Sequence, residues 1–78
     1  MNYNNRITGV VIGRIRTGRG LTQEVLSGLS GVARSHLAMI ESGTKNAGVD
    51  TLWRIASALG MPLSELIRLI EKEMALRS

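Results

Sequence analysis

Apolar residues recur along the chain with the spacing of amphipathic helices, in five segments separated by glycine, proline or polar residues. The segments cover approximately residues 5–17, 23–30, 33–41, 49–59 and 62–76. No segment alternates apolar and polar residues with a period of two, as a half-buried strand would. The pattern predicts an all-α fold in which residues 1–78 form a single domain.

Local signals mark several helix ends. Thr22 is a suitable N-cap for the second helix, and Gly60 follows the fourth helix at the position that favours glycine. Pro62 is expected in the first turn of the fifth helix. Gly9 and Gly13 lie inside the first helix, where each costs roughly 1 kcal/mol relative to alanine. They weaken this helix unless another backbone packs closely there.

The expected core is small, because a chain of 78 residues buries a limited share of its surface, and dimerisation would add stability. Its predicted members, in chain order, are Thr8, Val11, Ile12, Ile15, Val25, Leu26, Leu29, Leu37, Ile40, Leu52, Ile55, Ala56, Leu59, Leu63, Leu66, Ile67, Ile70 and Met74.

Residues 22–43 form two short helical segments joined at a glycine. Gln23 opens the first segment and Gly31 supplies the turn, while Leu37 and Ile40 define the buried side of the second. This order of residue types fits a helix-turn-helix, whose second helix can enter the major groove of DNA.

The side of that second helix opposite its buried residues carries Ser35, Ala38 and Met39, with Arg34 at its N-terminal edge. Arg34 can form the bidentate contact with guanine O6 and N7. Ser35 can hydrogen-bond a base edge or a phosphate, and Met39 can touch a thymine methyl. The alternative is an ordinary solvated helix face.

Four polar residues are candidate phosphate contacts. Gln23 lies at a helix N-terminus, where its side-chain amide and exposed backbone N–H groups can hold a phosphate, although simple capping is the alternative. Thr44, Lys45 and Asn46 follow the second helix of the helix-turn-helix, which we call the recognition helix. They lie in a loop that either contacts the DNA backbone or is merely solvated. His36 lies on the flank of this helix and is expected to pack or to adjoin a phosphate.

Composition narrows the classes of function. Ten Lys and Arg against six Asp and Glu give a net charge of +4 and favour an anionic partner, either nucleic acid or an acidic membrane surface. Cysteine is absent, which excludes disulfide and thiolate chemistry, and one histidine makes a metal site improbable, so no metal or other cofactor is expected. No apolar run suits a signal peptide or approaches the roughly 20 residues of a membrane span. We expect a cytoplasmic protein.

Three stretches of sequence, IRTGRGLTQE, LSGLSGVARSHLAMIESG and TLWRIASALGMPLSEL, resemble the lambda-repressor/Cro-like helix-turn-helix family. Within that family they are most similar to the small controller proteins of restriction-modification systems. The resemblance implies a five-helix DNA-binding domain and a transcriptional repressor or activator.

The resemblance also implies roles for individual residues. Gln23 would bind phosphate and buttress the recognition helix, and Asn46 would lie near the DNA backbone. The three residues matched to base-facing positions are Arg34, Ser35 and Met39. A further match implies a structural ion pair between Arg16 and Glu41.

Four positions depart from the family pattern. Ser27 replaces the usual alanine where a small side chain is needed, and Ser30 replaces an apolar residue, which predicts looser packing. Met39 occupies a position that is more often polar. Gly48 replaces a serine cap, so the fourth helix is expected to begin loosely.

The last two helices, about residues 49–76, carry apolar residues outside the expected core. Leu69 and Leu76 form a second apolar line on the fifth helix, and Trp53 lies off the main face of the fourth. They predict a twofold symmetric dimer, with a slightly apolar surface as the alternative. Such a dimer would place its recognition helices roughly 34 Å apart and bind a pseudo-palindromic operator.

The sequence therefore favours a homodimeric DNA-binding regulator that acts by occlusion or by recruiting RNA polymerase. One alternative is an antitoxin-like protein-interaction module with the same fold, which predicts a long exposed apolar surface. An enzyme is disfavoured, because His36 has no convincing Ser or Asp partner and Glu24 and Glu41 are far apart in the sequence.

Overall fold

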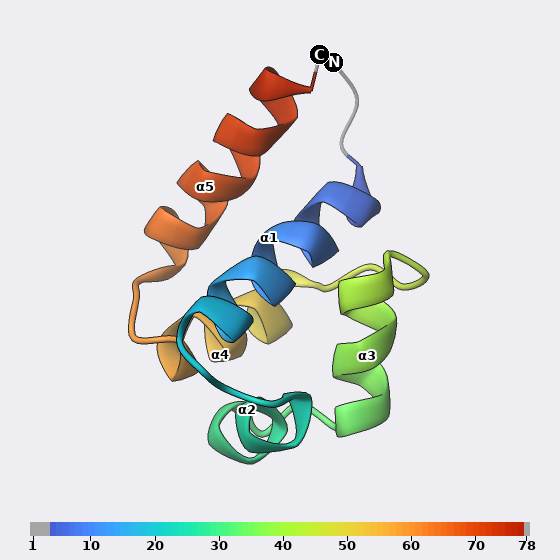
Figure 1. Cartoon of the computed structure of the whole chain (residues 1–78), viewed down its shortest axis with the longest axis vertical. Helices are drawn as coiled ribbons and strands as arrows, with labels where there is room; N and C mark the ends of the chain where they lie inside the picture. Colours follow the sequence, from blue (N-terminus) through green and yellow to red (C-terminus); the bar gives the residue numbers. More distant parts are fainter. Residues whose placement is uncertain (1–3, 78) are drawn as a thin grey trace.

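A computed structural model of the protein describes residues 4–77, which contain five α-helices (Figure 1). These are α1 (Asn5–Gly18), α2 (Gln23–Ser30), α3 (Arg34–Ser42), α4 (Val49–Ala58) and α5 (Leu63–Leu76). The all-α prediction is confirmed, and every expected helix agrees with the observed one to within one residue at each end. None of these helices combines the length and hydrophobicity needed to cross a lipid bilayer.

The central helix of the fold is α1, which packs against α3 on one side and α5 on the other (Figure 1). The fourth helix, α4, contacts α2 and α5, and α2 contacts α3. Helix α3 is therefore supported by α1 and α2, and its remaining side faces away from the protein.

Two of the three predicted end signals act as expected. The Thr22 hydroxyl accepts the backbone N–H of Val25 at 3.1 Å, which caps α2, and Gly60 follows α4 with a φ of +79°. The placement of Pro62 in the first turn of α5 was wrong. Its φ of −70° suits a helix, but its ψ of 154° is extended, so α5 begins at Leu63.

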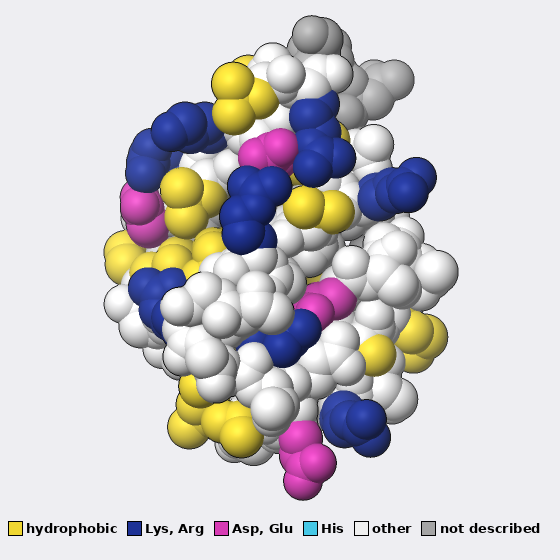
Figure 2. Space-filling model, in the orientation of Figure 1, with side chains coloured by type: hydrophobic (Ala, Val, Ile, Leu, Met, Phe, Trp, Pro, Cys, Tyr) yellow, Lys and Arg dark blue, Asp and Glu magenta, His cyan; other side chains and the backbone are white. Residues whose placement is uncertain are grey.

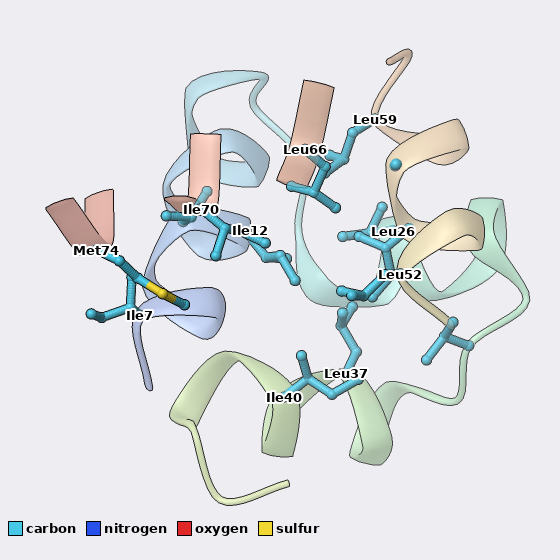
Figure 3. Packing of buried hydrophobic residues seen from close by; sticks show 14 residues of the cluster. Ile7, Ile12, Leu26, Leu37, Ile40, Leu52, Leu59, Leu66, Ile70 and Met74 are labelled. Carbon is cyan, nitrogen blue, oxygen red and sulfur yellow. The ribbon is translucent and has the colours of Figure 1, made fainter. Parts of the chain in front are cut away.

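One hydrophobic core receives side chains from all five helices. Figure 3 shows Ile12, Leu26, Leu37, Leu52 and Leu66, one from each helix, pointing into this interior. All five are buried. The predicted core residues of α4 are all buried as well, which confirms its predicted face.

The predicted burial of Val25 and Leu29 on α2 was wrong. Val25 is 47% exposed and Leu29 is 61% exposed, and Figure 2 shows hydrophobic side chains gathered over α2 at the lower left. This helix has only 8 residues and packs against α3 and α4 on one side, so Leu26 alone of its large apolar residues is enclosed.

The edge of the core differs from expectation in smaller ways. Ile15, Leu63 and Ile67 are only partly buried and pack against its rim. Ile7 and Val32 are buried although neither was predicted. Ile7 continues the apolar stripe of α1 by one turn, and Val32 lies in a turn, where helical periodicity gives no information.

A close approach between α1 and α3 explains why residue 9, inside α1, is a glycine. A Cβ atom added at Gly9 would collide with the backbone carbonyl oxygens of Ile40 and Glu41, near the end of α3. At Gly13, one turn later, an added Cβ would lie 3.2 Å from the carboxylate of Glu41. Another backbone does pack closely at Gly9, so glycine is required there despite its cost in a helix.

An ion-pair cluster joins the other side of α1 to α5. The carboxylate of Glu73 lies 2.9 Å from the Arg14 guanidinium and 2.8 Å from that of Arg77. Hydrogen bonds from Arg14 and then Arg77 lower the pKa of Glu73 to about 2. Glu73 therefore stays ionised and links α5 to α1 at neutral pH.

Replacing Gly9 by alanine should strongly destabilise the protein. The new methyl group must push α1 away from α3, which we expect to lower the free energy of unfolding by about 2–3 kcal/mol, as other overpacked sites do. Gly28→Ala is the matched control, since a Cβ added at Gly28 would meet nothing within 4 Å apart from its chain neighbours and the backbone of its own helix. That control should raise stability by about 0.5–1 kcal/mol through helix propensity. Equal urea midpoints for Gly9→Ala and the wild type would contradict the close approach.

Candidate nucleic-acid interface

The two sides of α3 differ sharply in exposure. Leu37 and Ile40 are 0% and 1% exposed, and they hold the helix against the core. Arg34, Ser35 and Met39 lie on the exposed side, where Met39 is 39% exposed. All three predicted base-facing residues are therefore accessible from outside the protein.

Two smaller features lie along the same helix. Ala38, which has a small side chain, is half-buried. His36 is also half-buried, as its predicted place on the flank requires. Its Nε2 atom is buried and has no hydrogen-bond partner within residues 4–77.

Two serines fix the turn between α2 and α3. The Ser27 hydroxyl donates to the carbonyl oxygen of Val32 at 2.6 Å, and the Ser30 hydroxyl accepts the N–H of Val32 at 3.2 Å. Gly31 follows Ser30 and ends α2 with a φ of +74°, in the left-handed region. The looser packing expected at Ser30 was wrong, because Ser30 is buried and its hydroxyl satisfies a backbone group.

The ion pair implied by the family resemblance is present. Arg16 Nε lies 2.7 Å from Glu41 Oε2 and Arg16 Nη2 lies 2.9 Å from Glu41 Oε1, a bidentate contact between α1 and α3. The Arg16 and Glu41 side chains are only 14% and 10% exposed. The hydrogen bond to Glu41 raises the pKa of Arg16, so this guanidinium keeps its charge.

Two further contacts extend this pair to α2. Arg16 Nη1 donates to the carbonyl oxygen of Leu21 at 2.8 Å, and Gln23 Nε2 donates to Glu41 Oε1 at 3.2 Å. Gln23 thus braces the recognition helix from α2. Sequence reasoning did not identify the backbone contact, because no residue type signals a carbonyl acceptor in a turn.

A concave surface of about 460 Å³ adjoins the N-terminus of α2. Its lining includes Arg16, Thr22, Gln23 and Arg34, so it brings together one predicted phosphate contact and one predicted base contact. The first N–H groups of a helix lack partners within the helix. The lining also includes the acidic Glu24, and Arg16 is paired with Glu41, so the backbone donors and the unpaired Arg34 are the groups that suit an anion such as a phosphate.

The loop after α3 divides into a capping part and a free part. The Thr44 hydroxyl donates to the carbonyl oxygen of Met39 at 3.2 Å and lies 2.9 Å from the Ser42 hydroxyl, so Thr44 holds the end of α3. Lys45 and Asn46 are exposed, and their side chains have no ion pair or hydrogen bond within residues 4–77.

The net positive charge of the protein belongs to the first half of the chain. Residues 1–48 carry six Lys and Arg and two Glu, whereas residues 49–78 carry four residues of each sign. Across the described part of the chain, five cations have no ion pair, and four of these belong to the first half. The five are Arg6, Arg19, Arg34, Lys45 and Lys72.

The predicted dimer residues occupy two separate places. Leu69 and Leu76 line a groove of about 240 Å³ between α1 and α5, where Leu76 is 71% exposed and Leu69 is half-buried. Trp53 lies on α4, is 56% exposed and does not line that groove. Val49 adds a second exposed apolar residue on α4 that the sequence reasoning missed.

Helices α2 and α3, joined by a glycine turn and seated on a helical core, define a helix-turn-helix DNA-binding fold. The helix-turn-helix family model matches residues 12–66, and the chain belongs to this family. It is a transcriptional regulator of the helix-turn-helix type, similar to restriction-modification controller proteins, and not an enzyme.

Individual relatives are consistent with this assignment. The chain is 37% identical over 62 residues to the uncharacterized HTH-type transcriptional regulator y4dJ of Sinorhizobium fredii, and the match covers 80% of each sequence. The controller protein C.AhdI from Aeromonas hydrophila superposes with a TM-score of 0.77 at 34% identity, over 80% of this chain and 94% of that one. The wild-type controller protein C.Esp1396I gives a TM-score of 0.85 at 25% identity, over 96% and 97%.

Glu41→Gln should loosen the recognition helix. It keeps the shape of the side chain but leaves the Arg16 guanidinium without its counter-charge, which we expect to cost about 2–3 kcal/mol in the free energy of unfolding. Glu65→Gln is the matched control, since it breaks an exposed pair with Arg68 on α5 and should cost less than about 1 kcal/mol. Similar losses in the two variants, measured by urea unfolding, would show that the Arg16–Glu41 pair has no special role.

Proposed function

We propose that the protein binds a pseudo-palindromic operator as a homodimer and controls transcription from that site. The observation that carries the proposal is the exposed side of α3, where Arg34, Ser35 and Met39 are accessible while the opposite side is locked into the core. An exposed, rigidly supported helix of this kind is what major-groove recognition requires.

Each of these side chains has a distinct task in the proposal. Arg34 forms a bidentate contact with a guanine, because its guanidinium has no ion pair within the described residues to compete for it. Ser35 hydrogen-bonds a base edge or a phosphate. Met39 contacts a thymine methyl, and the small Ala38 beside it allows the helix to approach the bases.

Contacts to the DNA backbone position the helix. Gln23, together with the N-terminus of α2, binds a phosphate in the concave surface that Arg34 also lines. Lys45 and Asn46 bind phosphates beyond the end of α3, and Thr44 keeps the loop in position through its bond to Met39. These contacts supply affinity without reading the sequence.

The homodimer is supported by the exposed apolar residues of the last two helices. Trp53 on α4, with Leu69 and Leu76 on α5, would be covered by a second copy. Twofold symmetry would then place two α3 helices in successive major grooves, roughly 34 Å apart. Bound there, the dimer would act by occluding a promoter or by recruiting RNA polymerase.

A second candidate function is an antitoxin-like interaction module that holds a partner protein and binds DNA secondarily. The exposure of Val25 and Leu29 on α2 favours it, since these residues lie on neither of the helices assigned to the dimer. The two functions differ in whether the purified protein alone selects a DNA sequence.

Selection from a pool of random duplexes, followed by sequencing of the retained DNA, tests the proposal directly. We expect enrichment of a pseudo-palindrome whose half-sites are about one helical turn apart. Retention without an enriched motif, lost uniformly as salt rises, would reject operator binding and favour the interaction module.

Arg34→Ala should weaken binding to the selected operator by about 1–3 kcal/mol and relax one base position in each half-site. Arg34→Lys is the informative control. Lysine keeps the positive charge but cannot make the bidentate contact of a guanidinium. The variant should therefore relax the sequence preference at the same base position while leaving the salt dependence of binding unchanged. An equal loss of affinity on operator and random DNA would reassign Arg34 to a phosphate.

Adding a charge to the dimer surface should produce monomers. Trp53→Glu and Leu76→Glu each place a carboxylate where a second copy would bury it, so sedimentation equilibrium should give a monomer mass and operator affinity should fall. Leu29→Glu makes the same change on α2 and should leave the dimer mass unaltered. If neither of the first two variants dissociates, α4 and α5 do not form the interface.

A further inference from the structure

The first helix carries an unusual excess of positive charge. Residues 1–23 contain four arginines and no carboxylate, and the first acidic residue of the chain is Glu24. Arg14 is paired with Glu73 and Arg16 with Glu41. The other arginine within α1, Arg6, has no ion pair in the described part of the chain.

Arg6 is held beside the end of the recognition helix. A Cβ atom added at Gly43 would lie 2.8 Å from the Cα atom of Arg6 and 3.3 Å from its backbone nitrogen. Gly43 ends α3 with a φ of +80°, and Lys45 follows two residues later. The first turn of α1 and the loop after α3 therefore meet at one place, which we call the α1/α3 corner (residues 4–7 and 43–46).

The α1/α3 corner is uniformly positive. It contributes the exposed side chains of Arg6 and Lys45 and the N-terminus of α1, where the Asn4 side chain accepts the N–H of Arg6 at 2.9 Å. No carboxylate occurs in residues 42–49. The nearby Glu41 is already occupied by Arg16 and Gln23.

The corner is also fixed relative to α3. The contacts at Gly9 and Gly43 join the backbones of α1 and α3 directly, without an intervening flexible side chain. A cation on the first turn of α1 therefore keeps its position relative to the side chains that face the bases. Preorganised charge of this kind binds a phosphate with little loss of conformational entropy.

We propose that Arg6 binds a backbone phosphate of the operator, next to the phosphate held by Lys45, and so makes α1 a DNA-contacting helix. The inference rests on the proposed operator binding. It adds a contact that is separate from the concave surface at α2, which Arg6 does not line. The positive end of α1 would reinforce this contact.

Arg6→Ala should change the salt dependence of binding. Loss of one phosphate contact reduces the slope of log K against log salt by about 0.9, which corresponds to roughly eightfold weaker binding at 0.1 M salt. The loss should be equal on the selected operator and on random duplexes, because a phosphate contact carries no sequence information. Lys45→Ala should have the same effect, and the double variant should lose about twice the slope.

Arg68→Ala is the matched control, since it removes the same charge from an exposed arginine on α5. Its salt slope should equal that of the wild type. Arg6→Lys should restore most of the lost slope, and urea midpoints for all variants should confirm that the exposed changes leave the fold intact.

Ethylation of DNA phosphates locates the contact independently. Ethylation at one outer phosphate per half-site should interfere with wild-type binding and cease to interfere with Arg6→Ala. A slope for Arg6→Ala equal to that of the wild type would overturn the inference, even if the wild type selects an operator. Failure of the wild type to select any motif would instead reject operator binding, and the slopes on random duplexes would still decide whether Arg6 contacts phosphate.

Discussion

The close contact between Gly9 and the last carbonyl groups of α3 is the constraint on which the DNA-binding surface depends. Because no side chain separates the two backbones, α1 crosses α3 at a fixed distance. Gly13 and Arg16 follow Gly9 on the same side of α1, at helical spacing. Gly13 leaves room for the Glu41 carboxylate and Arg16 binds it, so steric fit and ion pairing hold the same end of the recognition helix.

The ion pair contributes position more than net stability. Desolvating two charges offsets much of their attraction, so an apolar pair of similar size could be equally stable. An apolar pair would not have the directional hydrogen bonds of the Arg16–Glu41 pair. The bidentate contact fixes the rotation of α3 about its axis, and the hydrogen bond from Gln23 adds a second restraint from α2.

The sequence identified the helices and the helix-turn-helix because these depend on local spacing, caps and glycine turns, as at Thr22 and Gly31. It failed for Val25 and Leu29, since periodicity shows which residues share a side but not how much neighbouring surface covers a short helix. The sequence predicted loose packing at Ser30, because periodicity does not show that its hydroxyl accepts the backbone N–H of Val32 in the turn. The corner beside Gly43 could not be predicted, because it joins residues far apart in the chain.

The distribution of charge along the chain is consistent with one basic surface for DNA and one nearly neutral surface for a second copy of the protein. All of the net charge of +4 belongs to residues 1–48, while α4, α5 and the residues after them carry equal numbers of each sign. Arginines of that second half are paired with Asp50, Glu65 and Glu73. A dimer built on α4 and α5 would therefore bring nearly neutral surfaces together and avoid repulsion between two basic proteins. Four of the five unpaired cations, all except Lys72 on α5, belong to the basic first half of the chain, where each phosphate that they neutralise would release counterions and favour binding.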